Sequence, residues 1–156
     1  MTIIAADIMS SPVITVRPNT TVGEVARLMS KHRISAVVVV DSADRILGII
    51  SEADVLKPYR ESILARRAWW LDLIAEGEEM PKDFLEYLRQ DRHVAADVMV
   101  SDVVTADHRM TIPQLAELAV QKGVRRLPVV KDGKLVGIVS RHDLIRAIAG
   151  SRDALS

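Results

Sequence analysis

One short pattern, Gly-apolar-apolar-Ser-x-x-Asp, occurs twice in this sequence and carries the residue types best suited to binding chemistry. The two copies are Gly48, Ser51 and Asp54, and Gly137, Ser140 and Asp143. Each copy stands where an apolar run typical of a strand gives way to a helix. Free N–H groups at a helix start favour a phosphate, and a serine hydroxyl with an ionised aspartate can bind ribose hydroxyls. A glycine at the strand end would let a ligand approach the backbone.

The same pattern has a purely structural interpretation. A serine that opens a helix, followed three residues later by an acid, resembles a capping box, and an acid in the first turn suits the helix dipole. Both interpretations stay open at this point, because each requires the same residues in the same places.

The pattern belongs to a longer internal repeat. Ala6-Asp7-Ile8-Met9 recurs as Ala96-Asp97-Val98-Met99, and the match continues to the two serine-aspartate motifs with a single one-residue gap. The gap falls between two apolar runs, where the second copy has Asp132-Gly133, a strong hairpin signal. The sequence therefore predicts two related units, repeat one over residues 1–56 and repeat two over 94–156, separated by an insertion over 57–93.

Each repeat predicts the same elements in the same order. These are a short strand (13–16; 103–106), an amphipathic helix (21–31; 111–122), two strands in a hairpin (36–40 with 46–50; 127–130 with 135–139) and a helix from 51 or 140. The run 36–40 is apolar at every position, which predicts burial on both faces of the sheet. We therefore expect the face that the helices leave open to pack against the other repeat.

The insertion holds every aromatic residue of the chain. These residues are Tyr59, Trp69, Trp70, Phe84 and Tyr87. Apolar positions at helical spacing predict two helices here. Trp69, Trp70, Phe84 and Tyr87 could form a surface for a partner. Alternatively, the helices fold back onto their own module or complete its dimer, which would bury the same rings.

Composition excludes several classes of function. Lysine plus arginine and aspartate plus glutamate are both 21, so the formal charge is zero, which disfavours a nucleic-acid partner. There are no cysteines, and the four histidines are scattered, so we expect no metal site and no thiol chemistry. No apolar run approaches a membrane span, and no leader is recognisable. We expect a cytoplasmic protein and no enzyme, since the sequence has no nucleophile elbow and no phosphate-binding loop.

Taken together, the duplicated Asp-x-Met, the apolar-Thr strand and the Gly-x-x-Ser-x-x-Asp motif resemble a tandem pair of cystathionine-β-synthase (CBS) domains, a Bateman module. The resemblance implies an α/β (α+β) fold, with two β-α-β-β-α repeats packed sheet to sheet about a pseudo-twofold axis and adenosine ligands in clefts between them. The Arg-x-x-Trp-Trp-Leu linker resembles that of bacterial CBS pairs that continue into a BON domain. Since the sequence has no BON domain, we expect either a truncated chain or a protein without that output domain.

The resemblance also implies roles for individual residues. Asp54 and Asp143 would bind ribose hydroxyls, and Ser51 and Ser140 would contact ribose or phosphate. The adenine pocket would be lined by backbone groups near Thr15, Val16, Ala36, Val37, Thr105, Arg126, Leu127 and Pro128. Any Mg²⁺ would arrive with the nucleotide.

The two sites differ in charge. Repeat two has Arg141 and His142 inside its motif and Arg125-Arg126 before its hairpin, whereas repeat one has Glu52 inside its motif. Because phosphates favour cations, we expect phosphorylated ligands to bind more tightly at repeat two. The segment Lys31-His32-Arg33 could reach the opposite cleft and offset this difference.

The sequence therefore supports two hypotheses. The first is a non-enzymatic regulatory module that binds AMP-, ADP- or ATP-like ligands and couples occupancy to the packing of a homodimer or to an unknown downstream protein partner. The second is a constitutive dimerisation or interaction module without a ligand, in which the Ser-x-x-Asp motifs act only as helix caps.

Overall fold

The computed structural model describes residues 2–57 and 93–150. The predicted helices of the insertion and the predicted interface residues Trp69, Trp70, Phe84 and Tyr87 lie outside these residues.

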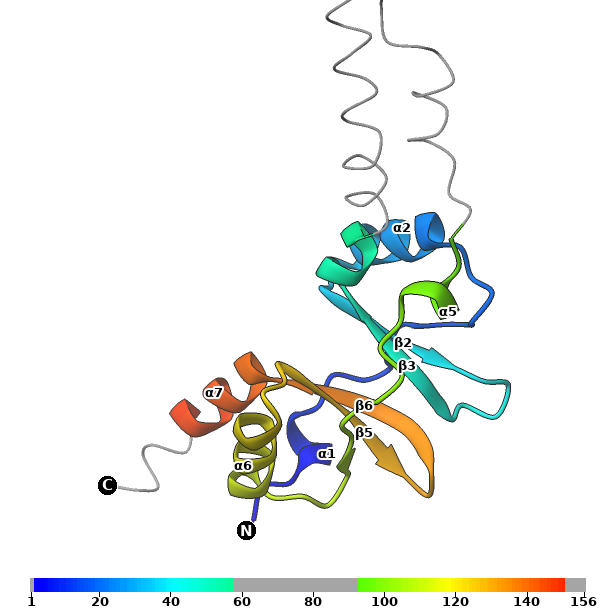
Figure 1. The fold of residues 1–156 in the computed structure, drawn as a ribbon. Coiled ribbons are helices and arrows are strands. Elements are labelled where there is room, and N and C mark those ends of the chain that lie inside the picture. The colour runs from blue at the N-terminus through cyan, green and yellow to red at the C-terminus, as the bar shows by residue number, and fades with distance from the viewer. Residues whose placement is uncertain (1, 58–92, 151–156) are drawn as a thin grey trace, which may run out of the picture. The chain divides into compact units, whose positions relative to one another are not determined.

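Each repeat contains a three-stranded sheet with its helices (Figure 1). Repeat one consists of α1 (Ala5–Ile8), β1 (Thr15–Val16), α2 (Val22–His32), β2 (Ala36–Val40) and β3 (Ile46–Ser51), followed by helical residues 52–57. Repeat two consists of α5 (Ala95–Val98), β4 (Ala106–Asp107), α6 (Ile112–Lys122), β5 (Arg126–Lys131), β6 (Lys134–Ser140) and α7 (Arg141–Gly150). The strand orders are β1-β2-β3 and β4-β5-β6. The predicted mixed fold with two sheets is thus confirmed.

Local sequence signals fix the ends of these elements. Thr21 and Thr111 cap α2 and α6 by accepting hydrogen bonds from backbone N–H groups three residues ahead. The β5–β6 hairpin turns on Asp132 and Gly133, whose φ angles of 52° and 76° are both positive, as a type I′ turn requires. All five residues of β2 are buried, which confirms the burial predicted from its apolar run.

The first strand of each repeat is shorter than predicted. Residues 13–16 were expected as a strand and only Thr15–Val16 forms one, while 103–106 is replaced by Ala106–Asp107. The reason lies in the residues just before these strands. Ser10 exchanges two backbone hydrogen bonds with Ile138 of β6, and Val100 exchanges two with Ile49 of β3. The residues just before β1 and β4 thus pair with a strand of the other repeat, and pairing within the repeat's own sheet begins only a few residues later.

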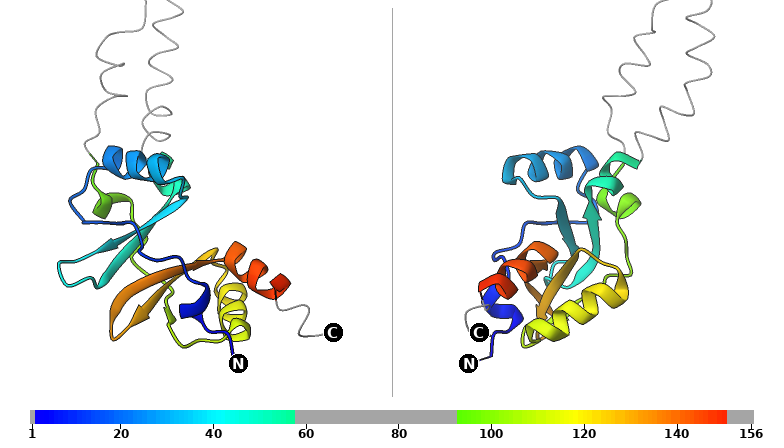
Figure 2. Two further views of the ribbon diagram at one scale, coloured as in Figure 1. Left: turned by 180° about the vertical axis from the view of Figure 1, so that it is seen from behind. Right: turned by 90° about the vertical axis from the view of Figure 1, so that its left-hand side faces the viewer.

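These bridges reveal that the repeats exchange their opening segments. The backbone N–H of Ala5 donates to Met110 O at 2.8 Å, and the N–H of Ala95 donates to Thr20 O at 2.7 Å. One compact unit accordingly contains residues 2–15 and 40–47 together with 102–150. Within this unit α1 lies against β6 and α7, which can be followed in the views of Figure 2. The small helix α1 is therefore part of the core built around repeat two.

The aspartate of each Asp-x-Met motif shapes the exchanged segment. Oδ2 of Asp7 accepts from the Ile4 N–H, and Oδ2 of Asp97 accepts from the Val94 N–H, both at 2.9 Å. Each carboxylate thus binds an N–H that the four-residue helix leaves without a helical partner.

Candidate functional site

In repeat one, the serine-aspartate motif forms the junction between β3 and the following helix. Ser51 is the last residue of β3, and its backbone N–H and its hydroxyl both donate to Oδ2 of Asp54 at 2.9 Å. The first helical N–H, that of Glu52, donates to Ser35 O at 3.2 Å. Asp54 is half-buried, and no hydrogen bond from residues 2–57 or 93–150 reaches its Oδ1. One oxygen of this carboxylate is therefore available to a ligand.

In repeat two, the corresponding junction lies between β6 and α7 and makes the same backbone hydrogen bond. Ser140 ends β6 and pairs with Arg126 across the hairpin, and the N–H of Arg141 donates to Arg125 O at 2.9 Å. The Ser140 N–H donates to Oδ2 of Asp143 at 2.8 Å, and the Asp143 N–H donates to the Ser140 hydroxyl at 3.1 Å. These two reciprocal bonds form a complete capping box.

The second carboxylate has an additional partner that the sequence analysis missed. Nη2 of Arg146 donates to Oδ1 of Asp143 at 2.5 Å, and the Asp143 side chain is only 7% exposed. The i,i+3 spacing of an acid and an arginine in a helix is the signal that could have revealed this pair. Repeat one has Lys57 at the matching position, and no ion pair joins Lys57 to Asp54 among the described residues.

The residues predicted to line an adenine pocket fall into two groups. The side chains of Val16, Val37, Leu127 and Pro128 are buried in the sheets, so only their backbone groups could face a ligand. Ala36 is buried, Thr105 is half-buried just before β4, and Thr15 is exposed. His142 is exposed in the first turn of α7. Nε of Arg141 donates to Val124 O at 3.0 Å, which holds this guanidinium close to the start of β5.

The glycines of the two motifs have a different function from the one expected. A Cβ added at Gly48 would lie 2.6 Å from Sδ and 3.0 Å from Cβ of Met99, and one at Gly137 would lie 2.6 Å from Cγ and 2.9 Å from Cβ of Met9. The space above each glycine is thus filled by the methionine of an Asp-x-Met motif. The glycines are required for packing against the exchanged segments, not for the approach of a ligand to the backbone.

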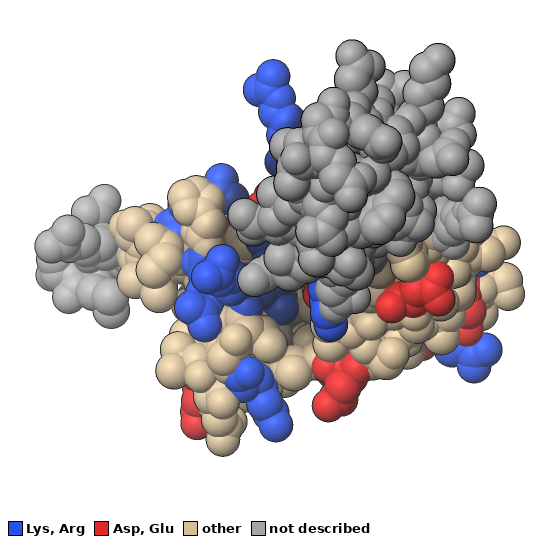
Figure 3. Space-filling view, turned by 45° about the horizontal axis from the view of Figure 1, so that its top comes forward, with Lys and Arg blue, Asp and Glu red and all other residues tan. Residues whose placement is uncertain are grey.

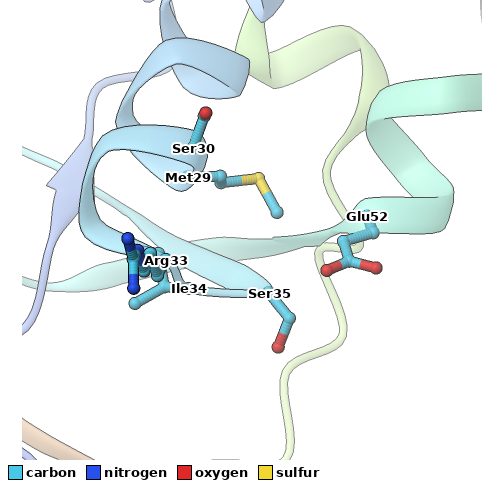
Figure 4. Close-up of a pocket in the computed structure, with 6 residues that line it drawn as sticks. All are labelled: Met29, Ser30, Arg33, Ile34, Ser35 and Glu52. Carbon is cyan, nitrogen blue, oxygen red and sulfur yellow. The ribbon is translucent and has the colours of Figure 1, made fainter.

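A surface hollow of about 400 Å³ adjoins the repeat-one junction. It is lined by Met29, Ser30, Arg33, Ile34, Ser35 and Glu52. Met29 comes from α2 and Glu52 from the helix after β3, and both side chains point into the space between these elements (Figure 4). Arg33 ends α2 in the left-handed conformation, with φ 52° and ψ 46°. The hollow therefore combines one cation, one anion and two hydroxyls with an apolar wall.

Three further observations concern metal ligands, membrane spans and surface charge in the described residues. Residues 2–57 and 93–150 contain no cluster of three or more His, Asp or Glu that could hold a metal ion. None of the helices described is long and apolar enough to cross a membrane. On the face shown in Figure 3, basic and acidic side chains are interspersed. The backbone N–H of Arg45 lowers the pKa of Asp41 and that of Arg109 lowers the pKa of Asp107, and both of these carboxyl groups lie outside the motifs.

Two repeats of one strand and helix order, each with a Ser-x-x-Asp helix start, define a tandem CBS-domain pair. The family model for the CBS domain matches residues 5–61 and 94–150, and the chain belongs to this family. It is 36% identical over 154 residues to the uncharacterized protein MJ1426 of Methanocaldococcus jannaschii, an alignment that covers 91% of this chain and 89% of that protein.

Solved structures of CBS pairs have the same fold. The CBS pair of protein MJ0100, in complex with 5′-methylthioadenosine and S-adenosyl-L-methionine, matches with a TM-score of 0.71 and 24% identity over 97% of this chain and 99% of that one. CBSX2 of Arabidopsis thaliana in complex with AMP matches with a TM-score of 0.70 and 24% identity over 96% and 98% of the two chains. CBS pairs of this fold thus bind adenosine ligands.

Proposed function

We propose that this protein is a regulatory module that binds an adenosine ligand, such as AMP, ADP or ATP, through its Ser-x-x-Asp motifs. The observation that carries the proposal is the available Oδ1 of Asp54, on a half-buried carboxylate at the start of a helix. The CBS pairs with bound 5′-methylthioadenosine, S-adenosyl-L-methionine and AMP support an adenosine ligand.

The chemistry of the motif suits a ribose. An ionised carboxylate only accepts hydrogen bonds and has lone pairs for both ribose hydroxyls after one oxygen has accepted a backbone N–H. The adenine base is held by backbone groups and aliphatic contacts, because the described repeats contain no aromatic residue. Arg33 lines the hollow beside repeat one, and Arg141 and Arg125 stand at the repeat-two junction, so these cations are the ones proposed to bind a phosphate. Mg²⁺ enters only with a nucleotide that carries it.

Regulation follows if the protein has two conformations and the ligand binds one of them with higher affinity than the other. In this proposal, occupancy changes the packing of a homodimer or the contacts with a downstream protein, and the module catalyses no reaction. Trp69, Trp70, Phe84 and Tyr87 remain the proposed residues for such an interface.

One observation favours the alternative of an interaction module without a ligand. In repeat two the motif forms a complete capping box, and in repeat one the Asp54 carboxylate accepts the Ser51 N–H, which is one half of such a box. If these bonds are the sole reason for the serine and the aspartate, neither residue affects any ligand.

A thermal-shift panel separates the two functions. The panel contains AMP, ADP, ATP with Mg²⁺, 5′-methylthioadenosine, S-adenosylmethionine and GTP. A ligand at 100 times its Kd stabilises a one-site protein by about 2.7 kcal/mol, or roughly 5–10 °C here. We expect a shift with at least one adenosine ligand and its loss in Asp54→Asn. Asp97→Asn is the matched control, because Asp97 makes the same backbone hydrogen bond at 2.9 Å outside the motif. No shift with any ligand at millimolar concentration would support the alternative.

A further inference from the structure

The two carboxylates proposed to bind ribose differ in one respect that the repeat does not predict. Both use Oδ2 to accept the serine N–H, which leaves Oδ1 for another partner. In repeat one no described group binds this oxygen. In repeat two it is bound by Arg146, whose side chain is 66% exposed while its guanidinium reaches a carboxylate that is 7% exposed.

This difference has a direct consequence for a diol ligand. A ribose that approaches Asp143 must displace or share Nη2 of Arg146 at Oδ1. A ribose hydroxyl and a guanidinium both make charge-assisted hydrogen bonds with a carboxylate, but only the guanidinium adds the Coulomb attraction of an opposite charge, so a neutral hydroxyl is the weaker partner for this oxygen. The burial of Asp143 adds to the effect, because little water is present to replace the lost partner.

We infer that Arg146 blocks the ribose-binding carboxylate of repeat two, so that an adenosine ligand binds first at Asp54 and only much more weakly at Asp143. This inference rests on the proposed function and adds the order in which the two sites fill. It opposes the charge argument from the sequence, in which the arginines of repeat two favour phosphorylated ligands. A ligand without phosphate isolates the effect of Arg146, because such a ligand offers the guanidinium no anion in exchange for Asp143.

Isothermal titration of the full chain with 5′-methylthioadenosine tests the inference. We expect one tight equivalent per chain, removed by Asp54→Asn. Arg146→Gln should improve the affinity of the second equivalent about tenfold or more and leave the first unchanged. Adding Asp143→Asn to Arg146→Gln should abolish that gain. Arg27→Gln is the matched control, because it removes an exposed i,i+3 pair with Glu24 at 2.8 Å on α2 and should change neither site.

The outcomes distinguish this inference from the function on which it rests. The role of Arg146 is overturned if the wild type binds two equivalents with equal affinity. It is also overturned if the second equivalent binds Arg146→Gln as weakly as it binds the wild type while the first binds normally. Both results leave the binding function intact. The absence of binding heat with 5′-methylthioadenosine and AMP in both wild type and Arg146→Gln overturns the proposed function and the inference together. Thermal unfolding of each variant without ligand establishes that it is folded.

Discussion

Replacing Gly137 with alanine tests the exchange of opening segments between the repeats. The new methyl group would lie 2.6 Å from Cγ and 2.9 Å from Cβ of Met9, and Sδ lies closer still. Rotation of the methionine side chain can move Cγ and Sδ away but not Cβ, so the segment of Met9 must shift. Inserting a methyl group into a packed site typically costs about 1–3 kcal/mol. For a chain of 156 residues this lowers Tm by roughly 2–12 °C.

The sign of the effect separates this account from a simpler one. If the space above the glycine were open, alanine in a strand would stabilise the protein by about 0.5–1 kcal/mol through the entropy of the unfolded chain. Gly150→Ala is the control, because among the described residues no atom outside the neighbouring turn of α7 lies within 4 Å of the added Cβ, and we expect it to be neutral or stabilising.

A double-mutant cycle identifies the residue that causes the clash. Met9→Ala alone is destabilising because it removes packing against Gly137 and the surrounding core. In the Met9→Ala background, Gly137→Ala should be neutral or stabilising, which gives a coupling of at least about 1 kcal/mol in urea unfolding. Additive effects, within about 0.5 kcal/mol, would refute the contact between these two residues and with it the exchange of segments.

Two further predictions follow from the local structure of the repeats. Gly123 and Arg33 end α6 and α2 in the same left-handed conformation, so Gly123→Ala should destabilise by about 1 kcal/mol and Arg33→Gly should stabilise by up to that amount in urea unfolding. The pKa of Asp41 is lowered from its ordinary value near 3.8, first by the backbone N–H of Arg45 and further by that of Ala43 and the Arg45 side chain. A carboxyl group whose pKa is lower in the folded state than in the unfolded state stabilises the protein at pH values above its unfolded-state pKa. This stabilisation is lost as the pH falls through the folded-state pKa. Asp41→Asn should therefore lower the Tm at pH 7, and the difference in Tm between the variant and the wild type should become smaller below about pH 4. A difference in Tm that grows at low pH would contradict this prediction.

The repeat, the sheets and the helices could be predicted from the sequence because local signals specify them. The Asp132-Gly133 turn, the apolar run of β2 and the cap at Thr111 each act over a few residues. The position of the Ser-x-x-Asp motifs at the strand-to-helix junctions was predictable for the same reason. The hydrogen bonds of repeat two match in full the capping interpretation that the sequence left open beside ligand binding, and those of repeat one match it in part, because the Ser51 hydroxyl donates to Asp54.

The exchange of opening segments could not be predicted, because it depends on long-range pairing. Nothing within Ala5–Ile8 specifies which of two similar sheets it packs against. The function of Gly137 was misjudged for the same reason, since its partner Met9 lies in the other repeat of the sequence. The pairing of Arg146 with Asp143 has a visible spacing, but most such helical pairs are exposed and weak, and only burial distinguishes this one.

The most direct test of the central claim is an isothermal titration of AMP into wild type, Asp54→Asn and Asp97→Asn. Hydrogen bonds to a charged group contribute about 1.5–3 kcal/mol, so loss of the Asp54 charge should raise the Kd roughly 10- to 150-fold. Asp97→Asn should leave the Kd unchanged, because it alters a carboxylate cap outside the motif. An equal Kd for wild type and Asp54→Asn would contradict ribose binding by this carboxylate, and the absence of binding in all three proteins would leave the motif as a helix cap alone.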